Sequence, residues 1–134
     1  MLRPRIIPCL LVHENGLVKT VGFSQSKYVG DPINAVKIFN EKEVDELIVL
    51  DIDASAANRP PDFRMIENLA KECRMPFCYG GGVKTVDQAI EIVKLGAEKV
   101  AFSSAILENP LLIKEVGERI GNQSVVVDFQ ESPN

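Results

Sequence analysis

The sequence contains few of the residues that build metal centres, disulfide frameworks and histidine-based active sites. Its 134 residues include one histidine, three cysteines and no tryptophan. The cysteines (Cys9, Cys73 and Cys78) are odd in number and lack a CxxC spacing, which favours reduced thiols in a cytoplasmic protein over disulfides or metal ligands. With His13 as the sole histidine, a zinc site lacks ligands and a histidine triad has one candidate. We therefore expect no metal and no cofactor.

Excess positive charge and long apolar runs are missing as well. The formal net charge of −4 and the pI near 5.0 argue against nucleic-acid binding, because such binding needs a basic surface. No apolar run approaches the roughly 20 residues that span a bilayer. Pro4 and Pro8 interrupt the apolar segment near the N-terminus, which does not resemble a signal peptide. We expect one cytoplasmic domain over residues 1–134, with no nucleic-acid or membrane partner.

Five apolar segments alternate with four helical patterns. The segments are mostly continuous runs, which is typical of parallel strands buried on both faces. The predicted strands cover residues 5–12, 46–53, 76–81, 99–103 and 124–129. The predicted helices follow Asp31-Pro32, Pro60-Pro61-Asp62, Thr85 (ending at Gly96) and Asn109-Pro110 (ending near Gly121). Capping and stop signals agree with the periodicity, so the pattern predicts an α/β fold, (βα)₄ plus a fifth strand and a short tail.

The first connection, residues 13–30, is the long one. Asn15-Gly16 within it is a turn signal flanked by apolar residues, and it predicts a short hairpin followed by a flexible stretch. Long loops in compact α/β domains usually serve function.

A glycine triplet and a pair of serines follow two neighbouring strands. Gly80, Gly81 and Gly82 end the third predicted strand just before the helix capped by Thr85, and Ser103-Ser104 end the fourth. Glycine lets backbone N–H groups approach a ligand, and a helix N-terminus favours an anion. The pattern predicts a phosphate site where the two strand ends converge. The alternative is a flexible turn with capping serines.

Carboxylates end the second predicted strand. If the strand continues to residue 53, alternation places Asp51 and Asp53 on one face, at the carboxyl edge where parallel sheets bind ligands. Two carboxylates there could hold a substrate hydroxyl or take acid and base roles. The alternative is that Asp51 only orders a loop, for example by pairing with Lys19.

Three charged residues lie at the opposite ends of the strands. Arg5, Glu46 and Lys99 begin the first, second and fourth predicted strands. Their spacing alone favours solvated strand-end charges over a functional role.

Several segments resemble a known enzyme family. RIIPCLLV, LVKT, DELIVLDIDAS, PFCYGGGV, LGAEKV and AFSSA are similar to the N-terminal half of the cyclase subunit of imidazole glycerol phosphate synthase. That family is a (βα)₈ barrel of about twice this length; it takes ammonia from a glutaminase and closes an imidazole ring on a bisphosphorylated substrate. The resemblance implies roles for these residues: Gly81, Gly82, Ser103 and Ser104 in phosphate binding, Lys19 and Asp51 in the active site, Cys9 in the barrel interior, and Arg5, Glu46 and Lys99 in a gate for ammonia.

The sequence departs from the family at two positions. Leu11 stands where the family has a catalytic aspartate, and Gln130 aligns with the second one, two residues after Asp128. The departures predict little or no cyclase activity. PCLLV and the segment from Lys27 to Ser55 also resemble cyclase-like homologues of surface-polysaccharide synthesis, which work with a glutaminase to place an amidine on a sugar.

Half of a barrel leaves strand edges and an apolar inner face uncovered, which predicts a homodimer or a higher even oligomer. Three functions remain open at this point. The chain is a phosphate-binding half-barrel with little or no catalysis, a cyclase-like or sugar-amidinating subunit acting as an oligomer with a glutaminase, or a non-catalytic assembly module.

Overall fold

The computed structural model describes residues 4–13, 16–21, 29–56, 59–103 and 109–128. A single seven-stranded sheet has the order β3-β2-β1-β4-β5-β6-β7. The strands are β1 (Cys9–His13), β2 (Leu17–Val21), β3 (Val29–Gly30), β4 (Leu47–Asp51), β5 (Phe77–Gly80), β6 (Lys99–Ser103) and β7 (Val125–Asp128). The helices are α1 (Pro32–Glu41), α2 (Ile52–Ala56), α3 (Phe63–Glu72), α4 (Val86–Leu95) and α5 (Pro110–Ile120), followed by a 3-10 turn at Asn122–Ser124. Among these helices none has the length and apolar character needed to cross a membrane.

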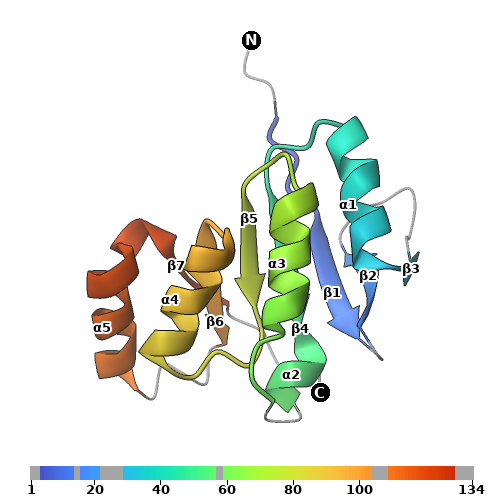
Figure 1. The fold of residues 1–134 in the computed structure, drawn as a ribbon. Helices are drawn as coiled ribbons and strands as arrows, with labels where there is room; N and C mark the ends of the chain where they lie inside the picture. Colours follow the sequence, from blue (N-terminus) through green and yellow to red (C-terminus); the bar gives the residue numbers. More distant parts are fainter. Residues whose placement is uncertain (1–3, 14–15, 22–28, 57–58, 104–108, 129–134) are drawn as a thin grey trace.

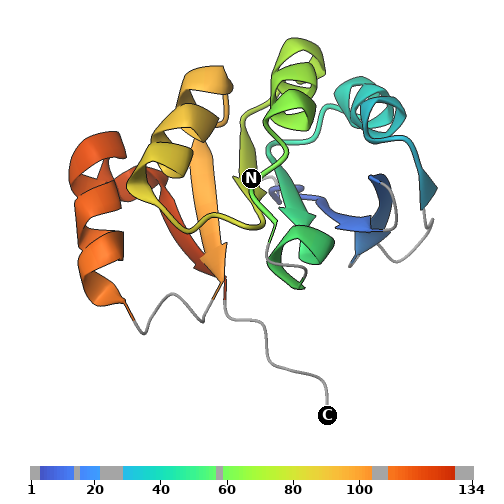
Figure 2. The same ribbon diagram turned by 60° about the horizontal axis from the view of Figure 1, so that its bottom comes forward.

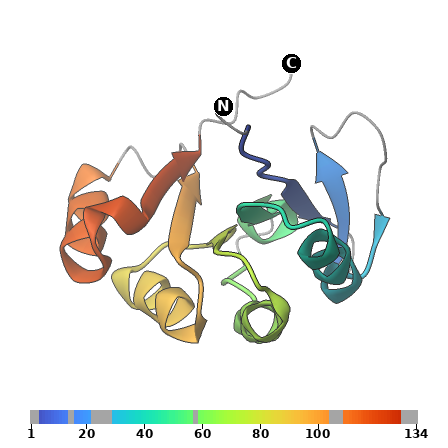
Figure 3. The ribbon, with the colours of Figure 1, turned by 90° about the horizontal axis from the view of Figure 1, so that it is seen from above.

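Five strands, β1, β4, β5, β6 and β7, pair in parallel and in chain order. They curve into an arc, and α1, α3, α4 and α5 lie along its outer side (Figures 2 and 3). None of these four helices lies on the inner side of the arc. This arrangement confirms the predicted (βα)₄ unit with an additional parallel strand.

The helices begin where the sequence predicts. Asp31, Asp62, Thr85 and Asn109 are the N-caps of α1, α3, α4 and α5, and each side chain accepts a backbone N–H from the first turn. The capping box of α4 is complete, because Gln88 also accepts the N–H of Thr85 at 3.2 Å. These caps fix the turns that return the chain from the carboxyl ends of the strands.

The first strand is shorter than predicted. β1 starts at Cys9 rather than residue 5, because Pro4 and Pro8 have no N–H to donate to a neighbouring strand. Residues 6–8 still run beside β4: Asp45 N–H donates to the Ile6 carbonyl at 2.9 Å, and Ile48 N–H donates to the Pro8 carbonyl at 3.0 Å. The predicted hairpin is present as the antiparallel pair β1–β2. The turn residue Asn15 and residues 22–28 lie outside the described ranges.

The second predicted strand also ends early, and this changes the site. β4 stops at Asp51, and residues 52–56 form the short helix α2 beyond the carboxyl ends of the strands (Figure 1). The predicted shared face of Asp51 and Asp53 is therefore wrong, because strand alternation does not continue past Asp51. The sequence does not predict α2, because its five residues are too few to show the apolar spacing that distinguishes a helix from a strand.

The two faces of the sheet differ in packing. The outward-facing residues of the central strands, among them Leu10, Leu47, Val49 and Tyr79, are fully buried under the helices. The alternate residues Cys9, Ile48 and Leu50 face the inner side and are only partly buried. The inner face therefore remains an apolar, partly exposed surface.

Candidate functional site

Asp51 is the buried carboxylate at the carboxyl end of β4. Its side chain is 7% exposed, and its Oδ1 accepts the N–H of Ala54 at 2.9 Å. Asp51 is thus both the last residue of β4 and the cap of α2, since a capping side chain accepts an N–H of the first helical turn. This hydrogen bond bends the chain and turns the next residues towards β1.

The bend brings Asp53 to His13, which ends β1. His13 Nδ1 lies 2.8 Å from Asp53 Oδ1, and the two side chains are 47% and 31% exposed. At this distance a hydrogen bond to the carboxylate selects the tautomer of the imidazole. The pair joins β1 to α2 at the edge where parallel strands place ligands.

The glycine triplet lines the neighbouring strand end. Gly81 and Gly82 have positive φ angles of 130° and 74°, which L-residues with a side chain rarely adopt. A Cβ on Gly81 would lie 2.5 Å from the Asp51 carbonyl oxygen, and one on Gly82 would collide with the Arg59 carbonyl. Gly80 passes between Ala101 and Leu50, whose atoms would lie 2.8 and 2.9 Å from an added Cβ. Close packing by itself thus accounts for all three glycines.

The predicted serine pair is only partly within the described residues. Ser103 is the last residue of β6, paired in register with Asp128. Ser104 lies outside the described residues. The carboxyl ends of β5 and β6 are adjacent in the sheet, so the glycine turn and Ser103 follow neighbouring strands, as the sequence predicts.

Lys19 and Leu11 form part of the inner face. Leu11 pairs with Lys19 on β2 and with Leu50 on β4, so the three side chains emerge on the same side of the sheet. Val12 pairs with Asp51, which places Asp51 on the opposite side by alternation. The structure therefore does not bring Lys19 and Asp51 together on one face.

Arg5, Glu46 and Lys99 meet at the amino end of the sheet. Glu46 Oε2 lies 3.3 Å from Arg5 Nη2, and Glu46 Oε1 lies 3.5 Å from Lys99 Nζ. Glu46 is the central partner and the most buried, with a side-chain exposure of 21%, against 63% for Arg5 and 35% for Lys99. The three predicted gate residues thus form one ion-pair cluster.

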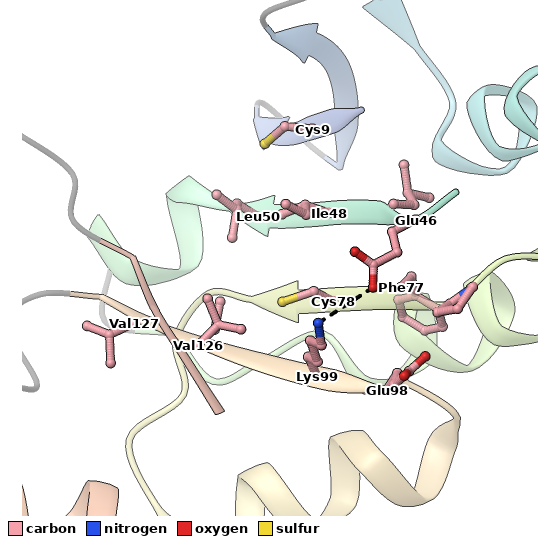
Figure 4. Close-up of a pocket in the computed structure, with 13 residues that line it drawn as sticks. Cys9, Glu46, Ile48, Leu50, Phe77, Cys78, Glu98, Lys99, Val126 and Val127 are labelled. Atoms are coloured by element: carbon pink, nitrogen blue, oxygen red, sulfur yellow. Dashed lines mark ion pairs between the residues drawn. The ribbon is translucent and has the colours of Figure 1, made fainter. Parts of the chain in front are cut away.

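A cavity of about 280 Å³ opens on the inner face beside this cluster. Glu46 and Lys99 lie at one end of it, and Leu50, Val126 and Val127 lie towards the other (Figure 4). Cys9 and Cys78 line the wall between them, so Cys9 lies at an interior position, as the resemblance implies. The cavity combines apolar walls with a charged rim.

Cys73 is the cysteine away from this cavity, at the C-terminal end of α3. Burial, with the nearby Glu72 carboxylate adding to it, raises the pKa of the Cys73 thiol to about 12. Burial likewise raises the pKa of Tyr79, whose hydroxyl accepts the Asp62 N–H at 3.4 Å. Both groups stay protonated at neutral pH, which suits structural rather than chemical roles.

The parallel strands in chain order, with a helix after each of the first four, define the class of the protein: it is one half of a (βα)₈ barrel. Residues 5–131 match the model of the family described as histidine biosynthesis protein. The chain belongs to that family.

Individual relatives agree with this assignment. A Vibrio vulnificus protein with the provisional name imidazole glycerol phosphate synthase subunit hisF3 is 64% identical over 127 residues, which cover 95% of this chain and 49% of that protein. A Leptospira borgpetersenii protein with the provisional name imidazole glycerol phosphate synthase subunit HisF is 58% identical, over 98% of this chain and 53% of its own length. Imidazole glycerol phosphate synthase subunit HisF of Streptococcus mutans is 43% identical, over 95% of this chain and 51% of its own length. The chain spans about half the length of the curated relatives it matches.

The sequence does not predict the pairing of His13 with Asp53. It offers His13 as the sole histidine and predicts a strand at Asp53. A signal was present in retrospect: an aspartate followed three residues later by a small residue, Asp51 and Ala54, is compatible with a helix cap. Only the fold shows that Asp53 on this helix lies beside His13 at the end of β1.

Proposed function

We propose that this chain is a half-barrel relative of the cyclase subunit which binds a phosphorylated ligand at the carboxyl ends of β5 and β6 and has little or no cyclase activity by itself. The proposed lack of cyclase activity rests on the position of Leu11. It lies on the inner face near the carboxyl end of β1, paired with Leu50, where the resemblance expects a catalytic aspartate. A leucine side chain cannot accept or donate a proton.

The ligand site is proposed from the turn after β5. Gly81 and Gly82 have positive φ angles, and backbone of this kind occurs in anion-binding turns. α4 begins a few residues later at its Thr85 cap, and the end of β6 lies next to the end of β5. A phosphate there would gain hydrogen bonds from N–H groups and hydroxyls of two strand ends.

Calorimetric titration tests this site. Fructose 1,6-bisphosphate and inorganic phosphate serve as probes, against the parent chain and Ser103→Ala and Ser104→Ala variants. We expect binding that weakens by roughly tenfold in either variant, the size of one lost hydrogen bond to a charged group. Ser124→Ala is the control, because Ser124 precedes β7 at the amino end of the sheet, away from the carboxyl ends of β5 and β6. If the parent binds neither probe, the phosphate-binding proposal is wrong and the assembly-module alternative gains.

A turnover assay tests the catalytic part. With Leu11 and Gln130 at the two aspartate positions, we expect no ammonia-dependent cyclisation of the histidine-pathway substrate. Measurable turnover would contradict this, and its loss in Asp51→Asn would then assign the chemistry to that carboxylate.

The ion-pair cluster favours a second candidate function, a subunit that works with a glutaminase in histidine or sugar-amidine synthesis. Glu46 and Lys99 line the amino end of the cavity, and Arg5 pairs with Glu46. This arrangement is suited to control the passage of a small molecule into the cavity. Ammonia-dependent turnover that requires an added glutaminase, and that changes in Glu46→Gln, would establish this candidate in place of the first.

We further propose that a second copy of the chain covers the inner face. The face is apolar, its strand β7 lies at a sheet edge, and Val126 on it is 37% exposed. A two-fold interface pairs a surface with itself, so one such face can bury another. A ligand with two phosphates would suit two glycine turns at one mouth.

Light scattering measures this assembly. We expect an even oligomer at micromolar concentration that dissociates in Leu50→Glu, which places a charge on the inner face. The matched control is Leu111→Glu on α5, where the side chain is 75% exposed on the outer side. A parent chain that stays monomeric would overturn the proposal.

A further inference from the structure

We propose that His13, oriented by Asp53, is the acid–base group at the carboxyl-end mouth of this half-barrel. The proposal adds to the ligand site above and rests on it. Its starting observation is an imidazole and a carboxylate 2.8 Å apart, supplied by two different elements, β1 and α2.

The contact determines which nitrogen of the neutral imidazole carries the proton. With Nδ1 directed at a carboxylate, the neutral ring carries its proton on Nδ1, and Nε2 becomes the basic nitrogen. When Nε2 takes up a proton, the Nδ1–H stays directed at the same carboxylate. A base held by a third group in this manner is the recurring arrangement of acid–base sites.

A chain of contacts holds the pair in place. Asp51 is buried and caps α2 through Ala54, Asp53 is the second residue of that helix, and His13 directly follows Val12, the partner of Asp51 in the sheet. Asp51 is therefore a positioning residue for Asp53. The side chains of His13 and Asp53 keep 47% and 31% of their surface exposed, so a ligand can reach them.

The pair also lies at the correct edge and distance for the proposed ligand. His13 ends β1, and the glycine turn follows β5, with only β4 between them. Two strand spacings amount to roughly 10 Å, which is comparable to the length of a phosphorylated pentose. In contrast, Leu11 lies two residues before His13 on β1, and its side chain cannot transfer a proton.

The simplest step available to such a group is ring opening of a sugar phosphate. Nε2 accepts the proton of the anomeric hydroxyl, the electron pair of that O–H bond forms the carbonyl, and the bond from the anomeric carbon to the ring oxygen breaks. The ring oxygen takes a proton from the imidazolium or water, and the reverse step closes the ring to either anomer. No oxidant, reductant or further reactant is needed.

The first experiment determines the tautomer. Because the chain has one histidine, ¹⁵N NMR of the protein without a histidine tag reports on His13 alone. At about pH 8.5, where an ordinary imidazole is neutral, we expect the proton on Nδ1, and its transfer to Nε2 in Asp53→Ala. Asp87→Ala is the matched control, since Asp87 is the second residue of α4 as Asp53 is of α2. A parent protein with the proton on Nε2 would overturn the proposal.

The second experiment measures the proton transfer. Ribose 5-phosphate is the probe, and exchange NMR follows the interconversion of its anomers. We expect acceleration above the buffer rate, with a loss of about 100-fold of the protein-dependent rate in His13→Gln and a smaller loss in Asp53→Ala, while both variants still bind the sugar phosphate. Asp87→Ala keeps the parent rate.

The outcomes separate this inference from the proposed function. If the parent binds ribose 5-phosphate without accelerating the exchange, or if His13→Gln keeps the parent rate, the acid–base role is wrong and the phosphate site stands. If the parent does not bind the sugar phosphate, the phosphate site is wrong and the acid–base role falls with it.

Discussion

The two ends of the parallel strands are held together in different ways. At the carboxyl end the contacts are short and partly buried: Asp51 caps α2, and Gly81 and Gly82 pass within van der Waals contact of Asp51 and Arg59. At the amino end the strands are joined by the ion pairs of Glu46, whose cationic partners remain substantially exposed. Close packing fixes geometry to within tenths of an ångström, whereas exposed ion pairs tolerate movement. The carboxyl end is therefore the preorganised one.

The largest effect is expected for Gly82→Ala at the carboxyl end. The new Cβ meets the Arg59 carbonyl, and the φ of 74° adds backbone strain, so the free energy of unfolding should fall by about 1–3 kcal/mol. Urea unfolding measures the change.

Gly16→Ala separates the two causes of that loss. Gly16 has a similar φ of 84°, but its Cβ would meet only Met65 Cε at an ordinary 3.6 Å. It should therefore lose less than Gly82→Ala. Equal losses would show that backbone strain alone governs the turn, and that the close approach to Arg59 is unimportant.

Removing the cap of α2 should have the next largest effect. Asp51→Ala leaves the Ala54 N–H without its acceptor, which is expected to cost about 0.5–2 kcal/mol, and it should also release Asp53 from His13. Asp51→Asn keeps an oxygen that can cap and should stay near the parent. Thermal unfolding gives the stability, and the His13 NMR signal gives the contact. An unchanged His13 signal in Asp51→Ala would show that the contact between His13 and Asp53 does not depend on the Asp51 cap.

A smaller effect is expected at the amino end. Glu46→Gln removes both ion pairs of the cluster, and the free energy of unfolding should fall by about 0.2–1 kcal/mol, less at high salt. Glu67→Gln is the control, because its pair with Lys71 at 3.3 Å is exposed within one helix, and about 0.2–0.5 kcal/mol is typical there. A loss above that of Gly82→Ala would reverse the comparison between the two ends.

The last effect is expected from Cys73, near the amino end, and it is confined to alkaline pH. The pKa of its thiol is raised to about 12 in the folded chain, from 9.0, so the unfolded chain releases this proton first as the pH rises. Its contribution to stability is complete below about pH 9 and is lost as the pH rises towards 12. Unfolding of the parent and Cys73→Ala at several alkaline pH values should show a steeper decline in the parent. Parallel curves would mean that the thiol is solvated, like the ion pairs nearby.

Much of the fold could be predicted from the sequence. The caps at Asp31, Asp62, Thr85 and Asn109 fixed four helix starts, because capping is a local interaction between residues two or three apart. The apolar runs located the parallel strands for a similar reason. The site was less predictable: Arg5, Glu46 and Lys99 lie 41 and 53 residues apart along the chain, and their contact depends on the strand register.

The sequence by itself determined the order of strands and helices, the family resemblance and the replacement of an acidic residue by Leu11. Local capping, apolar periodicity and residue identity suffice for these. Only the tertiary structure decided that β4 ends at Asp51, that α2 turns Asp53 towards His13, and that Lys19 and Asp51 occupy opposite faces of the sheet. These outcomes depend on strand register and on where one helix packs, and both are set by contacts between residues far apart in the chain.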